Sequence, residues 1–256
     1  MHEAPKPLGV PDLGAVEFST LKQALALGWH DFRARPGYGL FFAALTVVGG
    51  WLISWVTLST GQSYWLVFAA IGFPLIGPFA AVGLYEVSHR LQMGYEVTPA
   101  AITHAVLHQR KRQLPSLCSI IVTAFLFWFF LAHMIFALFL GLTPMTNISS
   151  SFEVFLQPNG LMMLAFGTAV GAIFAALLYS LTVFGMPLLL DRDIDFVTAM
   201  LTSLKVVTDA PVVMLSWGAF VAAVTFVSMI PGFLGLFIAI PIFGHASWHL
   251  YAQVKH

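Results

Sequence analysis

Residues 116–140 read SLCSIIVTAFLFWFFLAHMIFALFL and contain no Asp, Glu, Lys or Arg. A transmembrane α-helix needs about 20 predominantly apolar residues to cross about 30 Å of hydrocarbon. This run is therefore long enough to span a bilayer as one helix. It shows no alternation of polar and apolar residues, so it does not resemble a strand of a membrane β-barrel.

Five further apolar runs have comparable lengths. Because lipid accepts only backbones that are hydrogen-bonded internally, the predicted fold is an all-α polytopic integral membrane protein with about six transmembrane helices. We expect the long fourth run to tilt or break near Gly185-Met186-Pro187, and a Pro231-Gly232 turn to separate the last two runs. The six predicted spans are 38–58, 64–87, 116–140, 161–190, 212–229 and 233–251.

The composition of the 256 residues agrees with this class. Hydrophobic residues make up 59% of the chain and charged residues 9%, whereas soluble domains have about 45–50% and about 25%. The 11 Lys and Arg residues balance 11 Asp and Glu residues, so the basic excess that nucleic-acid binding requires is lacking. The single Cys118 excludes a disulfide framework and a cysteine-based metal cage.

The positions of the basic residues predict the orientation. Six crossings would place the N-terminal segment, the loops 88–115 and 191–211 and the C-terminus on one side, and these segments hold all 11 basic residues. The positive-inside rule then puts both termini in the cytoplasm. Residues 1–19 lack the apolar core of a signal peptide and are expected to form a cytoplasmic tail. The basic residues are Lys6, Lys22, Arg33, Arg35, Arg90, Arg110, Lys111, Arg112, Arg192, Lys205 and Lys255.

A short amphipathic stretch and a proline precede each odd-numbered span. Each stretch begins with a residue that can cap a helix (Ser19 or Thr20, Thr98, and Asp195), and we expect helices that lie in the cytoplasmic interface. The even-numbered spans share Gly/Pro steps. The pattern predicts one membrane domain, 20–256, built of three tandem units. The stretches are 20–32, 98–108 and 195–207, and the units are about 20–97, 98–192 and 193–256.

Four polar residues are expected at similar depth on the cytoplasmic side. His245 and His249 are four apart and share a helix face, while Glu86 and His89 end the second span. One interpretation is a cytoplasm-facing site, including a metal centre, although zinc would need further ligands. The other, which we favour, is a polar cap in which these residues and Trp248 hydrogen-bond neighbouring loops at the headgroup level.

His133 lies near the middle of the third span, where a polar side chain is costly unless it finds a partner. One interpretation is a haem ligand, a proton relay or a pathway residue. The favoured one is a neutral histidine bonded to a facing Ser, Thr or backbone carbonyl, for example at Thr168 or Thr225. Because a bis-histidine haem would need a second mid-membrane histidine, and the sequence has none, we expect no cofactor.

Three further segments have simple interpretations. Arg110-Lys111-Arg112 is expected to fix the topology through anionic lipid headgroups. Asp191-Arg192-Asp193 is expected to be a solvated turn. Gly167, Gly171 and Ala175 form a small-residue stripe on the fourth span. Such a stripe allows close helix packing, either within the bundle or against a partner.

The closing segment 244–251, GHASWHLY, resembles the hallmark of an uncharacterised bacterial membrane family that is common in alphaproteobacteria and is known only as a domain of unknown function. The segments 26–32 (ALGWHDF) and 71–78 (IGFPLIGP) resemble it too, and the resemblance covers about 21–251. It implies a six-helix protein of the bacterial inner membrane with no assigned reaction. Some members are loosely labelled as a terminal-oxidase subunit, but one mid-membrane histidine is too few for haem and copper centres.

These observations favour a protein that is not an enzyme. We expect an accessory, assembly or structural subunit of a larger membrane complex, such as a respiratory or photosynthetic electron-transport complex, that contacts lipid and either a membrane-protein partner or a second copy. The alternative is a small-solute transporter or channel whose pathway is lined by the Gly/Pro-broken helices. A polar cavity that reaches His133 would favour transport. A metal or haem site at His245 and His249 is the third hypothesis.

Overall fold

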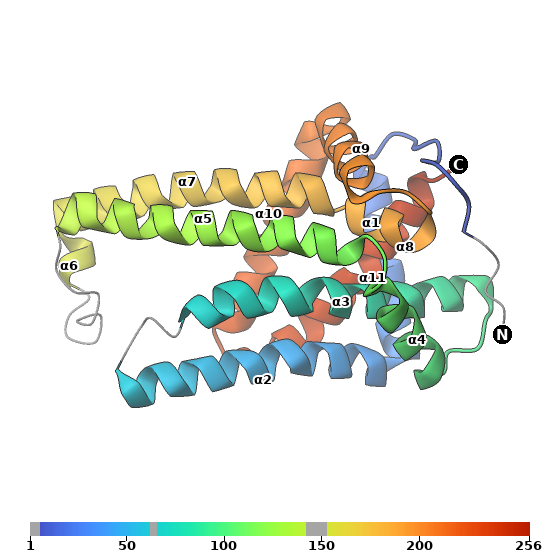
Figure 1. Cartoon of the computed structure of the whole chain (residues 1–256), viewed down its shortest axis with the longest axis horizontal. Helices are drawn as coiled ribbons and strands as arrows, with labels where there is room; N and C mark the ends of the chain where they lie inside the picture. Colours follow the sequence, from blue (N-terminus) through green and yellow to red (C-terminus); the bar gives the residue numbers. More distant parts are fainter. Residues whose placement is uncertain (1–5, 62–65, 142–152) are drawn as a thin grey trace.

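The computed structural model describes residues 6–61, 66–141 and 153–256, which form helices joined by short connections (Figure 1). The first residues of the expected tail (1–5) and of the second expected span (64–65) lie outside the described residues. The helices are α1 (Phe18–Ala34), α2 (Pro36–Thr60), α3 (Leu66–Met93), α4 (Pro99–Gln109), α5 (Leu114–Leu140), α6 (Glu153–Leu156), α7 (Pro158–Thr182), α8 (Gly185–Asp191), α9 (Phe196–Asp209), α10 (Pro211–Met229) and α11 (Leu236–Val254).

Five of the described helical stretches are long and apolar enough to cross a membrane, which confirms the all-α polytopic membrane fold. They are α2, α3 from Ile71, α5, the α7–α8 stretch and α10. The sixth expected span forms α11, but this helix is not one of the five. The reason lies in its second half, which carries polar residues such as His245, His249 and Gln253.

The long fourth run breaks where the sequence predicts it. The helix α7 ends at Thr182 and α8 begins at Gly185. The backbone N–H of Phe184, which lies in the break, donates to Ser203 Oγ on α9 at 3.0 Å. The break therefore leaves no unpaired N–H at this buried residue. The other Gly/Pro steps do not break their helices, since α3 continues through Pro74 and Pro78 and α11 through Pro241.

The three short amphipathic helices form as predicted. Thr98 and Asp195 cap α4 and α9 by accepting from the N–H groups of Ala101 and Thr198. The first helix begins two residues earlier than predicted, at Phe18, and its N-cap residue is Glu17 rather than Ser19 or Thr20. Thr20 still takes part in the cap, because its hydroxyl accepts from the Glu17 N–H at 3.3 Å. The three tandem units remain a prediction.

The turn between the last two helices also matches its prediction. The helix α10 ends at Met229 and α11 begins at Leu236. Gly232 (φ 62°) and Phe233 (φ 67°) both adopt the left-handed conformation in between, so the chain reverses within a few residues. The indole of Trp51 donates to the Gly232 carbonyl at 2.7 Å and ties this turn to α2.

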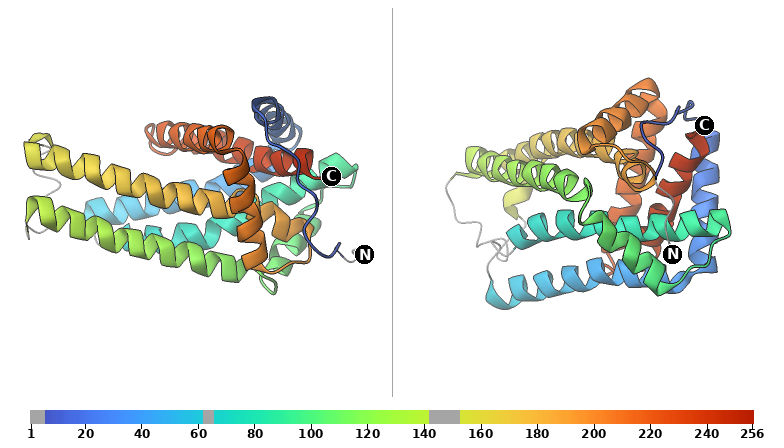
Figure 2. Two further views of the ribbon diagram at one scale, coloured as in Figure 1. Left: turned by 90° about the horizontal axis from the view of Figure 1, so that it is seen from above. Right: turned by 45° about the vertical axis from the view of Figure 1, so that its right-hand side comes forward.

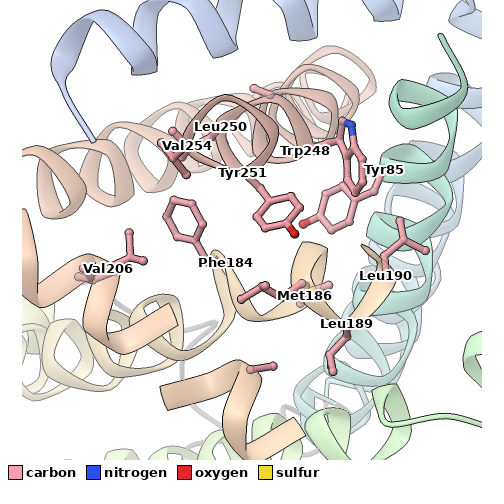
Figure 3. Packing of buried hydrophobic residues seen from close by; sticks show 14 of the residues in the cluster. Tyr85, Phe184, Met186, Leu189, Leu190, Val206, Trp248, Leu250, Tyr251 and Val254 are labelled. Atoms are coloured by element: carbon pink, nitrogen blue, oxygen red, sulfur yellow. The ribbon is translucent and has the colours of Figure 1, made fainter. Parts of the chain in front are cut away.

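The core lies at one end of the molecule, where α1, α11, α8 and the second half of α3 meet. Figure 3 shows Trp248 and Tyr251 of α11 beside Tyr85 of α3, and Phe184 close to α11. Both described ends of the chain lie here (Figure 1): the Gly14 N–H donates to the Val254 carbonyl at 2.7 Å. In contrast, α5 and α7 run side by side away from the core (Figures 1 and 2).

Candidate functional site

The predicted polar residues lie in this core end, on α3 and α11. The helix α3 continues past the predicted end of the second span to Met93, so Glu86 and His89 occupy its interior. On the other side, α1 crosses α11 very closely at Gly28. A Cβ atom at this position would lie 2.7 Å from both the Ala246 nitrogen and the Ile242 oxygen. Only glycine allows this approach, and it brings the next turn of α1 to His249.

The partner of His249 is Asp31, a residue that the sequence analysis did not select. His249 Nε2 lies 2.6 Å from Asp31 Oδ2, and both side chains are buried. Burial alone would raise the pKa of Asp31, but hydrogen bonds from His249 and Ser88 and the charges of His249 and His245 outweigh it, so the pKa lies below its usual value. The carboxylate is therefore the form that this site stabilises.

His245 belongs to the same set of hydrogen bonds. Its Nδ1 lies 2.8 Å from Ser88 Oγ, and both residues are completely buried. Because Ser88 also bonds Asp31, its hydroxyl donates to the carboxylate and accepts from His245 Nδ1–H. We call His249, Asp31, Ser88 and His245 the four-residue network. It joins α1, α3 and α11, and it leaves His245 Nε2 without a hydrogen-bond partner among the described residues.

The network bears on the metal hypothesis. His245 and His249 share a helix face, as predicted, but each bonds a different residue and the two do not converge on one point. In residues 6–61, 66–141 and 153–256, no group of three or more His, Cys, Asp or Glu side chains is placed to hold a metal ion. The geometry therefore gives the metal or haem hypothesis no support.

Glu86, His89 and Trp248 form a second group beside the network. Arg90 Nε donates to Glu86 Oε1 at 2.7 Å, and His89 Nδ1 lies 3.7 Å from Glu86 Oε2. The His89 ring packs 5.1 Å from the Trp248 ring, measured between centroids, and Trp248 Nε1 donates to Gln92 Oε1 at 3.1 Å. These contacts join α3 to α11, as a polar cap would.

His133 lies apart from these residues. It is exposed on α5, and its Nδ1 lies 2.7 Å from the Phe129 carbonyl one turn earlier in the same helix. Its partner is thus a backbone carbonyl of its own helix rather than Thr168 or Thr225. Sequence spacing alone could have suggested this bond, because residues four apart meet on one helix face.

The interpretation of Asp191-Arg192-Asp193 as a solvated turn is wrong for Asp191. This side chain is only 13% exposed and accepts from the Tyr251 hydroxyl at 2.6 Å and from Lys255 Nζ at 3.1 Å. Arg112, in turn, forms an ion pair with Asp193. Arg112 therefore joins two loops in addition to any role in topology.

A cavity of 380 Å³ opens beside Glu86, His89 and Trp248, and most of its lining residues carry a polar or charged group. This volume lies in the range of about 300–1,000 Å³ that small-molecule sites occupy. Gln109 is 1% exposed, and its Oε1 has no hydrogen-bond partner among the described residues. The other polar lining residues are Lys6, Arg90, Tyr95, His108 and Asp191.

Asp31 could have been found from the sequence. It follows Gly28 by three residues and thus lies on the apolar face of the first amphipathic helix, where an acid needs a buried partner. Ser88 carried no such signal, because serine is common at helix packing surfaces. The identity of either partner depends on how α1, α3 and α11 cross, which the spacing of residues does not encode.

Comparison with known proteins supports the membrane assignment. A family described as "Predicted integral membrane protein (DUF2189)" matches residues 66–191, from α3 to α8. The match confirms the resemblance to an uncharacterised membrane family. No curated protein and no solved structure matches the chain.

Proposed function

We propose that this protein is a non-catalytic subunit of a larger membrane complex and that it joins its partner through α5, α7 and α10. The observation that carries the proposal is the low burial of these helices. Only 11%, 6% and 11% of the apolar windows of α5, the α7–α8 stretch and α10 are buried inside the protein. Large side chains such as Phe130, Ile173 and Phe226 remain more than 60% exposed.

The small-residue stripe is used within the chain. A Cβ atom at Gly171 would lie 3.0 Å from the Trp128 ring, and one at Gly167 would lie 3.9 Å from Ile135, so the stripe packs α7 against α5. The outer faces of both helices consequently present large apolar side chains. Contiguous apolar surface of this kind fits lipid or a second transmembrane surface.

The polar end of the molecule is consistent with a structural role. The charged and titratable side chains of the four-residue network and of the Glu86 group bond one another. A respiratory or photosynthetic electron-transport complex of a bacterial inner membrane is the kind of assembly that we expect, and the label of terminal-oxidase subunit carried by some members of the resembling family agrees with the respiratory one. Transport has less support, because α3 and α11 run unbroken through their prolines and His133 lies on the outside of α5.

Site-directed photocrosslinking in native membranes tests the proposal. A photoreactive amino acid replaces Phe130 on α5 or Ile173 on α7, and in the control it replaces His104, which is exposed on α4. We expect Phe130 and Ile173 to give one protein adduct of the same defined mass and His104 to give none. An adduct of twice the chain mass identifies a second copy. Adducts to lipid alone at both positions would refute the proposal.

A further inference from the structure

An apolar cleft lies between α2, α3 and α4 and shares no lining residue with the polar cavity. It has a volume of 700 Å³, and its walls come from Phe41, Phe42 and Leu45 on α2, from Ile76 and Phe79 on α3, and from Ile102, Val106 and Leu107 on α4. Thr103 and Tyr38 are among its few polar lining residues. The cleft is therefore suited to a hydrocarbon ligand rather than to a polar solute.

The depth of the cleft matches one membrane leaflet. Arg35 and Leu45 both line it, and ten residues of α-helix rise about 15 Å. This is about half of the 30 Å hydrocarbon thickness of a bilayer. The helix α2 is one of the membrane-spanning candidates, so the cleft extends from the interface toward the bilayer midplane.

The interfacial mouth of the cleft is positively charged. Arg35 is exposed at the junction of α1 and α2, and its side chain forms no hydrogen bond or ion pair within the described part of the chain. No side chain caps the N-terminus of α2, whose Gly37 also lines the cleft. First-turn N–H groups and the helix dipole favour an anion at this end, and no acidic residue lines the cleft.

We propose that this cleft binds one acyl chain of an anionic phospholipid, with the lipid phosphate beside Arg35. The lipid comes from the leaflet on the side of the chain termini, since Arg35 lies next to α1 at the core end. The apolar walls of the cleft contact the acyl chain, and the depth of the cleft fits the length of an acyl chain in one leaflet. Arg35, a cation without an acidic partner, complements the negative headgroup. A zwitterionic lipid with the same acyl chains would bind more weakly, because its own quaternary ammonium group competes with Arg35 for the phosphate.

Native mass spectrometry of the delipidated full chain in detergent tests this proposal. Palmitoyl-oleoyl phosphatidylglycerol and phosphatidylcholine are titrated separately. Because one basic residue near a membrane surface contributes about 1 kcal/mol, Arg35→Gln is expected to weaken phosphatidylglycerol binding about fivefold and to leave phosphatidylcholine binding unchanged. Lys205→Gln, which removes an exposed cation on α9 that does not line the cleft, is the control and should retain wild-type binding.

Two variants fill the cleft from opposite walls. Ile76→Phe on α3 and Thr103→Trp on α4 replace exposed lining residues, so each should reduce binding of both lipids while circular dichroism and elution volume remain those of the wild type. Leu201→Trp, which is exposed on α9, is the control for adding a bulky ring. Equal losses of phosphatidylglycerol binding in Arg35→Gln and Lys205→Gln, or unchanged binding in both filled variants, would overturn the proposal.

Discussion

Asp31 and His249 form a buried hydrogen bond between the first helix and the last. The 2.6 Å distance and the burial of both side chains describe a charge-assisted bond, which is shorter and stronger than a neutral one. Ser88 connects this bond to His245, so removing any one of these side chains affects the packing of three helices. The energetic importance of these residues follows from their burial, because exposed pairs of the same type contribute little.

We expect Asp31→Asn to destabilise the protein by about 1.5–3 kcal/mol, the range for a hydrogen bond to a charged group. Asparagine keeps the shape but has neither the charge nor the second acceptor oxygen of the carboxylate. Asp209→Asn, at an exposed position on α9, should remain within about 0.5 kcal/mol of the wild type. Thermal or denaturant unfolding in one detergent measures the difference between the two variants.

The effect of Asp31→Asn should depend on pH. Because the folded-state pKa of Asp31 lies below the ordinary aspartate value of 3.8, the carboxylate stabilises the fold fully above that ordinary value. This contribution is lost as the pH falls through the lowered folded-state pKa. The stability gap between wild type and Asp31→Asn should therefore be constant above about pH 5 and shrink in stronger acid. A gap that widened below pH 4 would contradict the assignment.

At the scale of helices, the packing of α1 on α11 depends on the absence of a side chain at Gly28. The atoms nearest to a Cβ there belong to the backbone of α11, which cannot rotate away as a side chain would. The same crossing fixes the position of Asp31 one turn later. A helix contact thus determines the geometry of a polar site.

We expect Gly28→Ala to destabilise the protein by about 1–3 kcal/mol, as overpacking does, and to lengthen the Asp31–His249 bond. Gly72→Ala is the matched control, since a Cβ atom at Gly72 would meet nothing within 4 Å. Alanine in the interior of α3 should stabilise the protein by about 0.5–1 kcal/mol. Unfolding midpoints that moved in the same direction for both variants would contradict the close crossing.

Local sequence patterns predicted where helices begin, end and break far better than which side chains contact one another. Thr98, Asp195 and the Gly185–Pro187 step carry local signals for a cap or a break, and the structure has caps and a break at these places. The sixth span shows what a hydropathy count misses. The second half of α11 carries polar residues such as His245 and His249, which the protein buries against other helices rather than against lipid. The partner of His249, the burial of Asp191 and the outward position of His133 depend on tertiary arrangement, which no local pattern encodes.

At the scale of the whole molecule, the four-residue network and the Glu86 group lie at the end that holds both described termini. The helices α5 and α7 extend from this end (Figure 2). The basic loops around Arg112 and Arg192 lie at this end too, since Arg112 pairs with Asp193 and the neighbouring Asp191 accepts from Tyr251 of α11. The positive-inside rule predicts that such an end faces the cytoplasm. The orientation can be measured directly.

Single cysteines introduced at exposed positions should report the orientation. In a Cys118→Ala background, Lys111→Cys is expected to react with a membrane-impermeant maleimide only after the cells are opened. Gln157→Cys, exposed beside α6 at the far end of the α5–α7 pair, should react in cells whose outer membrane alone is permeabilised. The reverse labelling pattern would show that the termini lie outside the cytoplasm.

The contact between Asp31 and His249 joins residues that are 218 positions apart. A ribosome therefore delivers α1 to the membrane surface long before it has made the surface on which α1 packs. Until α11 emerges, Asp31 has to remain hydrated and Gly28 faces no neighbouring backbone. Contacts of such large sequence separation form slowly, because the intervening loop has to close first. The polar end can thus consolidate only after α11 has been synthesised, so a product that stops before α11 would keep an unpacked first helix that quality-control proteases can recognise.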